Sequence, residues 1–96
     1  MIVTAELAGV EIARSDRTVV VEGNHYFPPE DVASEHLIPT DTHTRCGWKG
    51  LASYWTVRAA GTAVVDGAWA YPDPSDSARQ IKDHLAFANG ITVREV

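Results

Sequence analysis

The segment from residue 49 to residue 65 constrains the fold more than any other part of the chain. Residues 49–58 alternate between large apolar side chains on one face and smaller or hydroxylated ones on the other, which is the two-residue period of a β-strand. Ala59-Ala60-Gly61 follows, and its glycine can adopt the positive φ that a tight hairpin turn needs. Residues 62–65 then return as the partner strand. The segment therefore predicts an antiparallel β-hairpin.

Strand patterns also occupy much of the chain before this hairpin. Residues 2–7 alternate, and Thr18-Val19-Val20-Val21 is β-branched throughout, so its restricted χ1 rotamers favour a strand over a helix. We expect residues 35–38 to form one more short strand, ended by Pro39. Residues 40–47 lack apolar periodicity and are predicted to form a loop.

Helical signals are confined to two places. The pair Pro28-Pro29 precedes two acidic residues, which suits the first turn of a short helix or 3₁₀ segment. After Pro74, Ser77 and Gln80 have the spacing of a capping box and predict one short helix. The fold class is therefore mainly β: a single small β-sandwich or half-open barrel of roughly six to eight short strands with one short helix after Pro74.

Length and charge limit the classes of protein that this chain can belong to. Its 96 residues fit one domain, spanning residues 1–96. The net charge of −5 argues against nucleic acid and anionic membranes as partners, because both need a basic footprint. No apolar stretch approaches the roughly 20 residues that span a bilayer, and no signal-peptide pattern is present. We therefore expect a cytoplasmic protein.

Metal chemistry has little support in the sequence. The single cysteine excludes an internal disulfide and a cysteine-rich zinc site. His43 and Cys46, together with His25 or His36, would supply the three ligands of an open zinc site. Nothing else in the chain supports that set, so we predict no metal and no cofactor.

Aromatic side chains are the main functional signal. Seven of the eight lie between residues 26 and 71. Five of them fall beside a turn or a proline and carry a polar tip on an apolar body, so together they can line a pocket for a flat or polar small ligand. The same pattern also fits a core rich in Trp and Tyr, and Phe27 and Trp55 are assigned to that core. The candidate ligand-binding aromatics are Tyr26, Trp48, Tyr54, Trp69 and Tyr71.

Lys49 and Cys46 are the candidate reactive residues. Lys49 can bind a carboxylate or phosphate as a point charge, or act as nucleophile or base if burial lowers its pKa. The alternative is an exposed lysine at the start of a strand. Cys46 becomes a reactive thiolate if Arg45 or a protonated His43 lies beside it, and is otherwise an inert buried thiol.

These residues also carry a resemblance to a known family. The run from residue 44 to residue 55 is similar to the central pattern Thr-x-Cys-Pro-Trp-Lys-Gly-x-Ala-x-Tyr of the DUF427 family, with Gly47 in place of the proline. Tyr26-Phe27-Pro28 upstream and the segment 68–74 downstream match two further family elements. The resemblance covers roughly residues 19–93 and implies a small bacterial domain of unknown function in which Lys49 is important. The family's other label, which suggests a nucleotidyltransferase, has no support in these residues.

The sequence therefore predicts a small domain that binds a small polar or anionic ligand in an aromatic-lined pocket, with Lys49 as its charged contact. A small enzyme, either a hydrolase or a transferase using Lys49 or Cys46, is the first alternative. The second is a protein-interaction module that uses an exposed aromatic surface.

Overall fold

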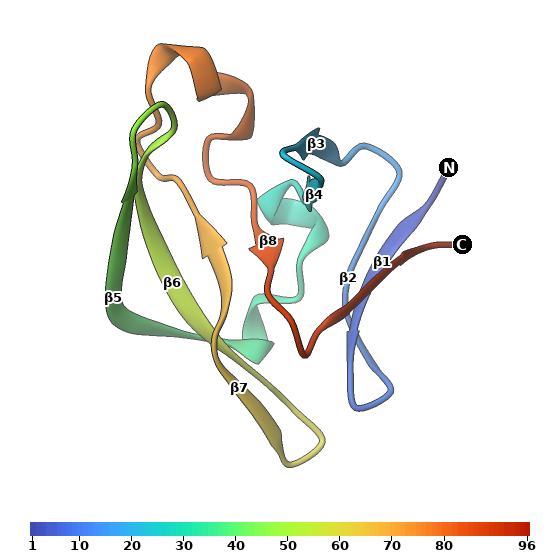
Figure 1. The fold of residues 1–96 in the computed structure, drawn as a ribbon. Helices are drawn as coiled ribbons and strands as arrows, with labels where there is room; N and C mark the ends of the chain where they lie inside the picture. Colours follow the sequence, from blue (N-terminus) through green and yellow to red (C-terminus); the bar gives the residue numbers. More distant parts are fainter.

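Three small antiparallel sheets make up the structure, a computed structural model that describes residues 1–96 (Figure 1). One sheet has the order β2-β1-β9, the second pairs β3 with β4, and the third has the order β5-β6-β7-β8. The 3₁₀ segments η1 (Pro29–Asp31) and η2 (Ser34–His36) connect β4 to β5, and η3 (Asp76–Ile81) lies between β7 and β8. The strands are β1 (Val3–Leu7), β2 (Val10–Ser15), β3 (Val19–Val21), β4 (Asn24–Tyr26), β5 (Leu37–Cys46), β6 (Gly50–Ala59), β7 (Thr62–Ala70), β8 (Ala86–Phe87) and β9 (Thr92–Glu95).

The predicted hairpin is confirmed as β6 and β7. Its turn residues Ala60 and Gly61 have φ of 51° and 76°, both positive as in a type I′ turn. The predicted loop at residues 40–47 is wrong, because β5 continues through Cys46 and pairs with β6 on both sides of an irregularity between Pro39 and His43. Polar residues fill this strand because β5 lies at the edge of its sheet. Pro39 also lies inside β5 and does not end it; an edge position tolerates a residue without a backbone N–H.

The predicted helical segments form as 3₁₀ turns. Pro29–Asp31 is a 3₁₀ turn as predicted. The segment after Pro74 is η3, which begins after Ser75 with no side-chain cap, so the predicted capping box at Ser77 is wrong. Ala78 has non-helical backbone angles, which prevents an α-helix from forming there. No helix in the structure is long and apolar enough to cross a lipid bilayer.

Each face of the four-stranded sheet carries its own hydrophobic core. The larger core, with 14 buried residues including Phe27, Val57 and Phe87, packs against the sheet formed by β1, β2 and β9. The smaller core has seven, including Tyr26, Tyr71 and Ile81, and lies beneath β3, β4 and η3. The mainly β, sandwich-like fold is thus confirmed, and the four-stranded sheet is its central wall.

Alternation along β7 distributes side chains to these two cores. Ala68 and Ala70 belong to the larger core, whereas Trp69 packs against the smaller core and Tyr71 belongs to it. Phe27 is fully buried, as predicted. Trp55 packs against the larger core but is only partly buried, so its assignment to the core holds only in part.

A β-bulge interrupts β7 near its centre. The register between β6 and β7 shifts between Trp55 and Val57, opposite Asp66, whose φ is 54°. A Cβ atom on Gly67 would lie 2.9 Å from the carbonyl oxygen of Val64, so only glycine fits. In a regular strand residues three apart face opposite sides, yet Asp66 and Trp69 line the same pocket. The bulge therefore turns Asp66 toward the smaller core.

Candidate functional site

A pocket of about 400 Å³ opens on the face of the sheet that carries the smaller core. It is lined by strands β4, β6 and β7, by the turn between β3 and β4, by the turn between β5 and β6, and by Ala88 beyond β8. We call it the aromatic pocket. Five of the six predicted ligand-binding residues line it, namely Tyr26, Lys49, Tyr54, Trp69 and Tyr71, together with Glu22, Asn24, Asp66 and Ala88.

Lys49 is buried at one end of the aromatic pocket. Only 5 % of its side chain is exposed, and its ammonium forms an ion pair with Glu22. Lys49 Nζ lies 4.9 Å from the ring centroid of Trp48 and 5.6 Å from that of Tyr71. The electron-rich faces of both rings attract the cation. The interpretation of Lys49 as an exposed lysine is therefore wrong.

The ammonium of Lys49 stays charged in this setting. Burial opposes the charged form, but the hydrogen bonds to Glu22 and Cys46 outweigh burial and raise the pKa of Lys49 above its ordinary value. The same contact lowers the pKa of Glu22, helped by the Trp48 indole, whose N–H donates to the carboxylate at 3.2 Å. Trp48 itself remains 41 % exposed at the rim.

Ser75, which directly precedes η3, holds the turn that carries Lys49. Ser75, next to η3, donates its backbone N–H to the carbonyl of Lys49 at 3.0 Å. Its hydroxyl donates to the carbonyl of Trp48. The two bonds fix the segment between β5 and β6, so the position of Lys49 is set by the backbone as well as by its ion pair.

Trp69 forms the middle of the pocket wall. Its indole N–H donates to the hydroxyl of Tyr26 at 3.2 Å, and its ring lies 6.4 Å from the ring of Tyr54, tilted by 37°. The Tyr54 hydroxyl is 2.9 Å from that of Thr44. Burial raises the pKa of Tyr26 and of Tyr71, so both tyrosines stay neutral and act as hydrogen-bonding groups.

Two acidic residues of the site were not predicted. Glu22 lies in the turn between β3 and β4, and Asp66 lies in the bulge of β7. Asp66 accepts hydrogen bonds of 2.7 Å from the hydroxyls of Thr40 and Thr42, which lower its pKa. The dipeptides Glu22-Gly23 and Asp66-Gly67 mark irregular backbone, but nothing in the sequence shows that both face Lys49's pocket.

Cys46 is the last residue of β5 and pairs with Gly50, the residue that follows Lys49. The pKa of the Cys46 thiol is lowered, first by hydrogen bonding to the backbone N–H groups of Trp48 and Lys49 and then by the Lys49 side chain. The thiol is partly exposed. Its charged partner is therefore Lys49 and not Arg45 or His43.

His43 bonds within its own hairpin instead. Its Nδ1 lies 3.2 Å from the carbonyl oxygen of Ala52. No three His, Cys, Asp or Glu side chains gather closely enough to hold a metal ion.

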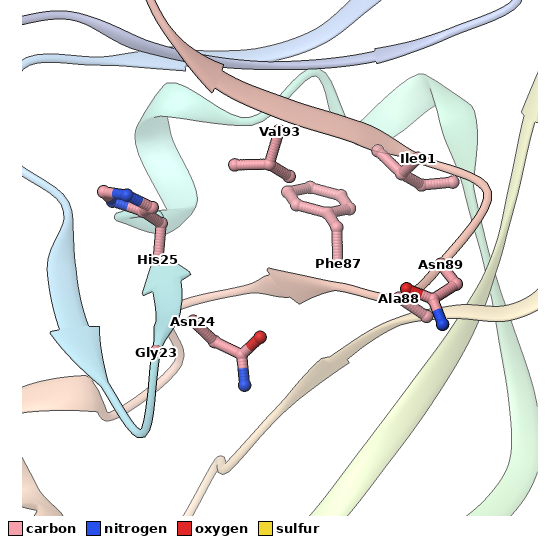
Figure 2. A pocket seen from close by; sticks show the side chains of 8 residues that line it. All are labelled: Gly23, Asn24, His25, Phe87, Ala88, Asn89, Ile91 and Val93. Carbon is pink, nitrogen blue, oxygen red and sulfur yellow. The ribbon is translucent and has the colours of Figure 1, made fainter.

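A second cavity of about 250 Å³ adjoins the aromatic pocket and shares Asn24 and Ala88 with it. Figure 2 shows Phe87, Ile91 and Val93 grouped on one side of this cavity, with the side-chain amides of Asn24 and Asn89 on the other. No Asp, Glu, Lys or Arg side chain lines this second cavity. A third cavity, of about 420 Å³, lies beside Trp55 and Leu85, on the side of the larger core.

The chain matches a known protein family whose activity is not established. No curated protein sequence matches the chain. The sequence model of the family described as NTP_transf_9, domain of unknown function (DUF427), matches residues 2–96. This covers nearly the whole chain, including every residue of the aromatic pocket. The protein belongs to the DUF427 family.

Proposed function

We propose that this domain binds a small polar ligand carrying a carboxylate or phosphate group in the aromatic pocket, with Lys49 as the charged contact. The observation that carries the proposal is a charged ammonium, buried among aromatic rings, at the end of a pocket of about 400 Å³. Small-molecule sites commonly combine such apolar walls with a few convergent polar groups. A buried lysine that only stabilised the fold would not need an open pocket beside it.

Glu22 occupies the place that the ligand's anionic group would take. Its carboxylate accepts from Lys49 and from the Trp48 indole. Its own side chain is 51 % exposed and comes from a tight turn, so it can move into water when the ligand's anionic group replaces it as the partner of Lys49. The two donors, which bond different oxygens of Glu22, then remain, and two oxygens of a ligand carboxylate or phosphate can accept from them.

The walls supply the remaining contacts. The faces of Trp69 and Tyr54 can hold the apolar body of a ligand. The Tyr71 hydroxyl forms no hydrogen bond within the chain and lies on the pocket wall, so it is free to bond with the ligand.

An enzyme is the second candidate, and Cys46 is the residue that favours it. The lowered pKa of Cys46 increases the thiolate fraction, whereas the raised pKa of Lys49 keeps the amine protonated and unsuited to act as a nucleophile. In this alternative, a hydrolase or transferase, the Cys46 thiolate attacks an acyl carbon of a ligand that Lys49 orients. The bond to the leaving group breaks, the leaving group takes a proton from water, and water or an acceptor then cleaves the thioester. The interaction-module alternative has only Trp48 as an exposed aromatic residue, so nothing specific favours it.

The test is a thermal-shift screen of small carboxylates and phosphates on three proteins: wild type, Lys49→Met and Lys82→Met. Lys82 is the only other lysine and is exposed on the surface, outside the aromatic pocket. We expect ligands that stabilise wild type and Lys82→Met but not Lys49→Met. Equal stabilisation of all three proteins would refute the role of Lys49, and a screen without any stabilising compound would refute the binding function.

A further inference from the structure

We infer that the ligand is an elongated zwitterion, which lies along β7 with its anionic group at Lys49 and an ammonium group at Asp66. The inference rests on the proposed function and names the class of ligand for the same site. It follows from the order of side chains along the pocket and from the balance of charge between its two ends.

The pocket is long, and its ends differ in charge. Asp66 and Trp69 lie on β7, Tyr71 directly follows the strand, and all three line the pocket. At about 3.3 Å per residue, the backbone positions of Asp66 and Tyr71 are at most about 16 Å apart, and the bulge at Asp66 shortens that distance. Lys49 Nζ lies 5.6 Å from the Tyr71 ring, so the ammonium and the Asp66 carboxylate mark opposite ends.

The charge at the Asp66 end is not balanced within the chain. One cationic and two anionic side chains line the pocket, so its net formal charge is −1. Glu22 compensates Lys49, whereas Asp66 has no ion pair and accepts only from the neutral hydroxyls of Thr40 and Thr42. A carboxylate has about four acceptor positions, and two remain. An ammonium group on the ligand can fill them.

The middle of the pocket selects for an apolar spacer. Trp69 and Tyr54 provide the wall between the charged ends. The Tyr54 hydroxyl already bonds with Thr44, and the Trp69 indole N–H already donates to Tyr26. A chain of methylene groups loses no hydrogen bonds when it packs there. The backbone separation of Asp66 and Tyr71 is longer than the ligand, because at each end a side chain and a hydrogen bond of about 2.8 Å lie between backbone and ligand. We therefore expect a ligand whose two charges are separated by about 8–10 Å.

The experiment uses 8-aminooctanoate, octanoate and octylamine as matched probes, with binding to the aromatic pocket followed by NMR chemical shifts. At about 1.2 Å per bond, the charges of 8-aminooctanoate are about 10 Å apart. We expect wild type to bind it about tenfold or more tightly than octanoate, and more tightly than the shorter 4-aminobutyrate. Octanoate binding as tightly as 8-aminooctanoate would overturn the inference and leave the proposed function intact. Absence of 8-aminooctanoate binding at 20 mM would also overturn the inference.

Two variants assign each end of the probe. In Asp66→Asn the new residue tolerates the positive φ of 54°, so we expect an unchanged fold, unchanged octanoate binding and loss of the preference for 8-aminooctanoate. In Lys49→Met we expect octanoate and 8-aminooctanoate both to bind more weakly. A preference that survives in Asp66→Asn would overturn the inference alone, whereas equal octanoate affinity in Lys49→Met and wild type would overturn the proposed function.

Discussion

The indole N–H of Trp69 donates a hydrogen bond of 3.2 Å to the hydroxyl of Tyr26, and the two rings meet edge to face with centroids 6.4 Å apart. The pair joins the central sheet to the small sheet of β3 and β4 across 43 residues of sequence. Because Glu22 belongs to the turn of the same small sheet, this contact also positions the partner of Lys49.

Substitution of Tyr26 by phenylalanine tests this bond. Tyr26 is 1 % exposed, so Tyr26→Phe leaves the indole N–H of Trp69 without its acceptor. We expect the free energy of unfolding, measured in urea, to fall by about 1 kcal/mol. Tyr54→Phe is the control, because its hydroxyl bonds to Thr44 where water can replace it, and it should cost less than about 0.5 kcal/mol. Equal losses in both variants would contradict a structural role for the Tyr26 bond.

The ion pair of Lys49 and Glu22 should respond unequally to removal of its two partners. Glu22→Gln leaves a buried ammonium without its counter-charge, which is costly. Lys49→Met puts an apolar side chain among aromatic rings and leaves Glu22 in water. We therefore expect Glu22→Gln to lower the melting temperature more than Lys49→Met does at neutral pH. The opposite order would show that Lys49 is not buried as described.

The pH profile of Cys46 alkylation tests the environment of the thiol. Its pKa is lowered first by the backbone N–H groups of Trp48 and Lys49, then by the Lys49 side chain. The iodoacetamide rate should therefore reach half its maximum at a lower pH in the folded protein than in the same protein unfolded in urea. Lys49→Met should shift the folded profile upward only in part, because the backbone bonds remain. Identical folded and unfolded profiles would contradict this account.

Gly67 should not be replaceable by alanine without loss of stability. In Gly67→Ala the added methyl would lie 2.9 Å from the carbonyl oxygen of Val64, and relieving that overlap should cost about 1–3 kcal/mol in the free energy of unfolding. Gly47→Ala is the matched control, because no atom lies within 4 Å of its position, and it should change stability by less than about 0.5 kcal/mol. A neutral Gly67→Ala would mean that the bulge relaxes without strain.

Local turn chemistry made part of the fold predictable. The hairpin of β6 and β7 follows from alternation and from Ala60-Gly61, both of which act within a few residues. β5 could not be predicted in the same way, because Thr40, Thr42 and Thr44 form a strand with polar faces at the sheet edge, and such a strand has no apolar period. Its partner strand β6, not its own sequence pattern, makes this segment extended.

The candidate site was predictable only as a set of aromatic residues around Lys49. Clustering of Tyr and Trp indicated which rings to consider, and the structure brings most of them to one pocket. Glu22 lies 27 residues from Lys49, and Asp66 faces the pocket only because a bulge shifts the strand. Contacts of that kind depend on strand register between distant segments, which no local pattern encodes.

A central sheet with a core on each face separates two tasks within one small chain. Apart from the bulge at Asp66, alternate side chains of β7 face different cores, so the pocket and the larger core are built from different residues of this strand. Substitutions of pocket residues would thus leave unchanged the 14 buried residues of the larger core, which packs against the sheet of β1, β2 and β9.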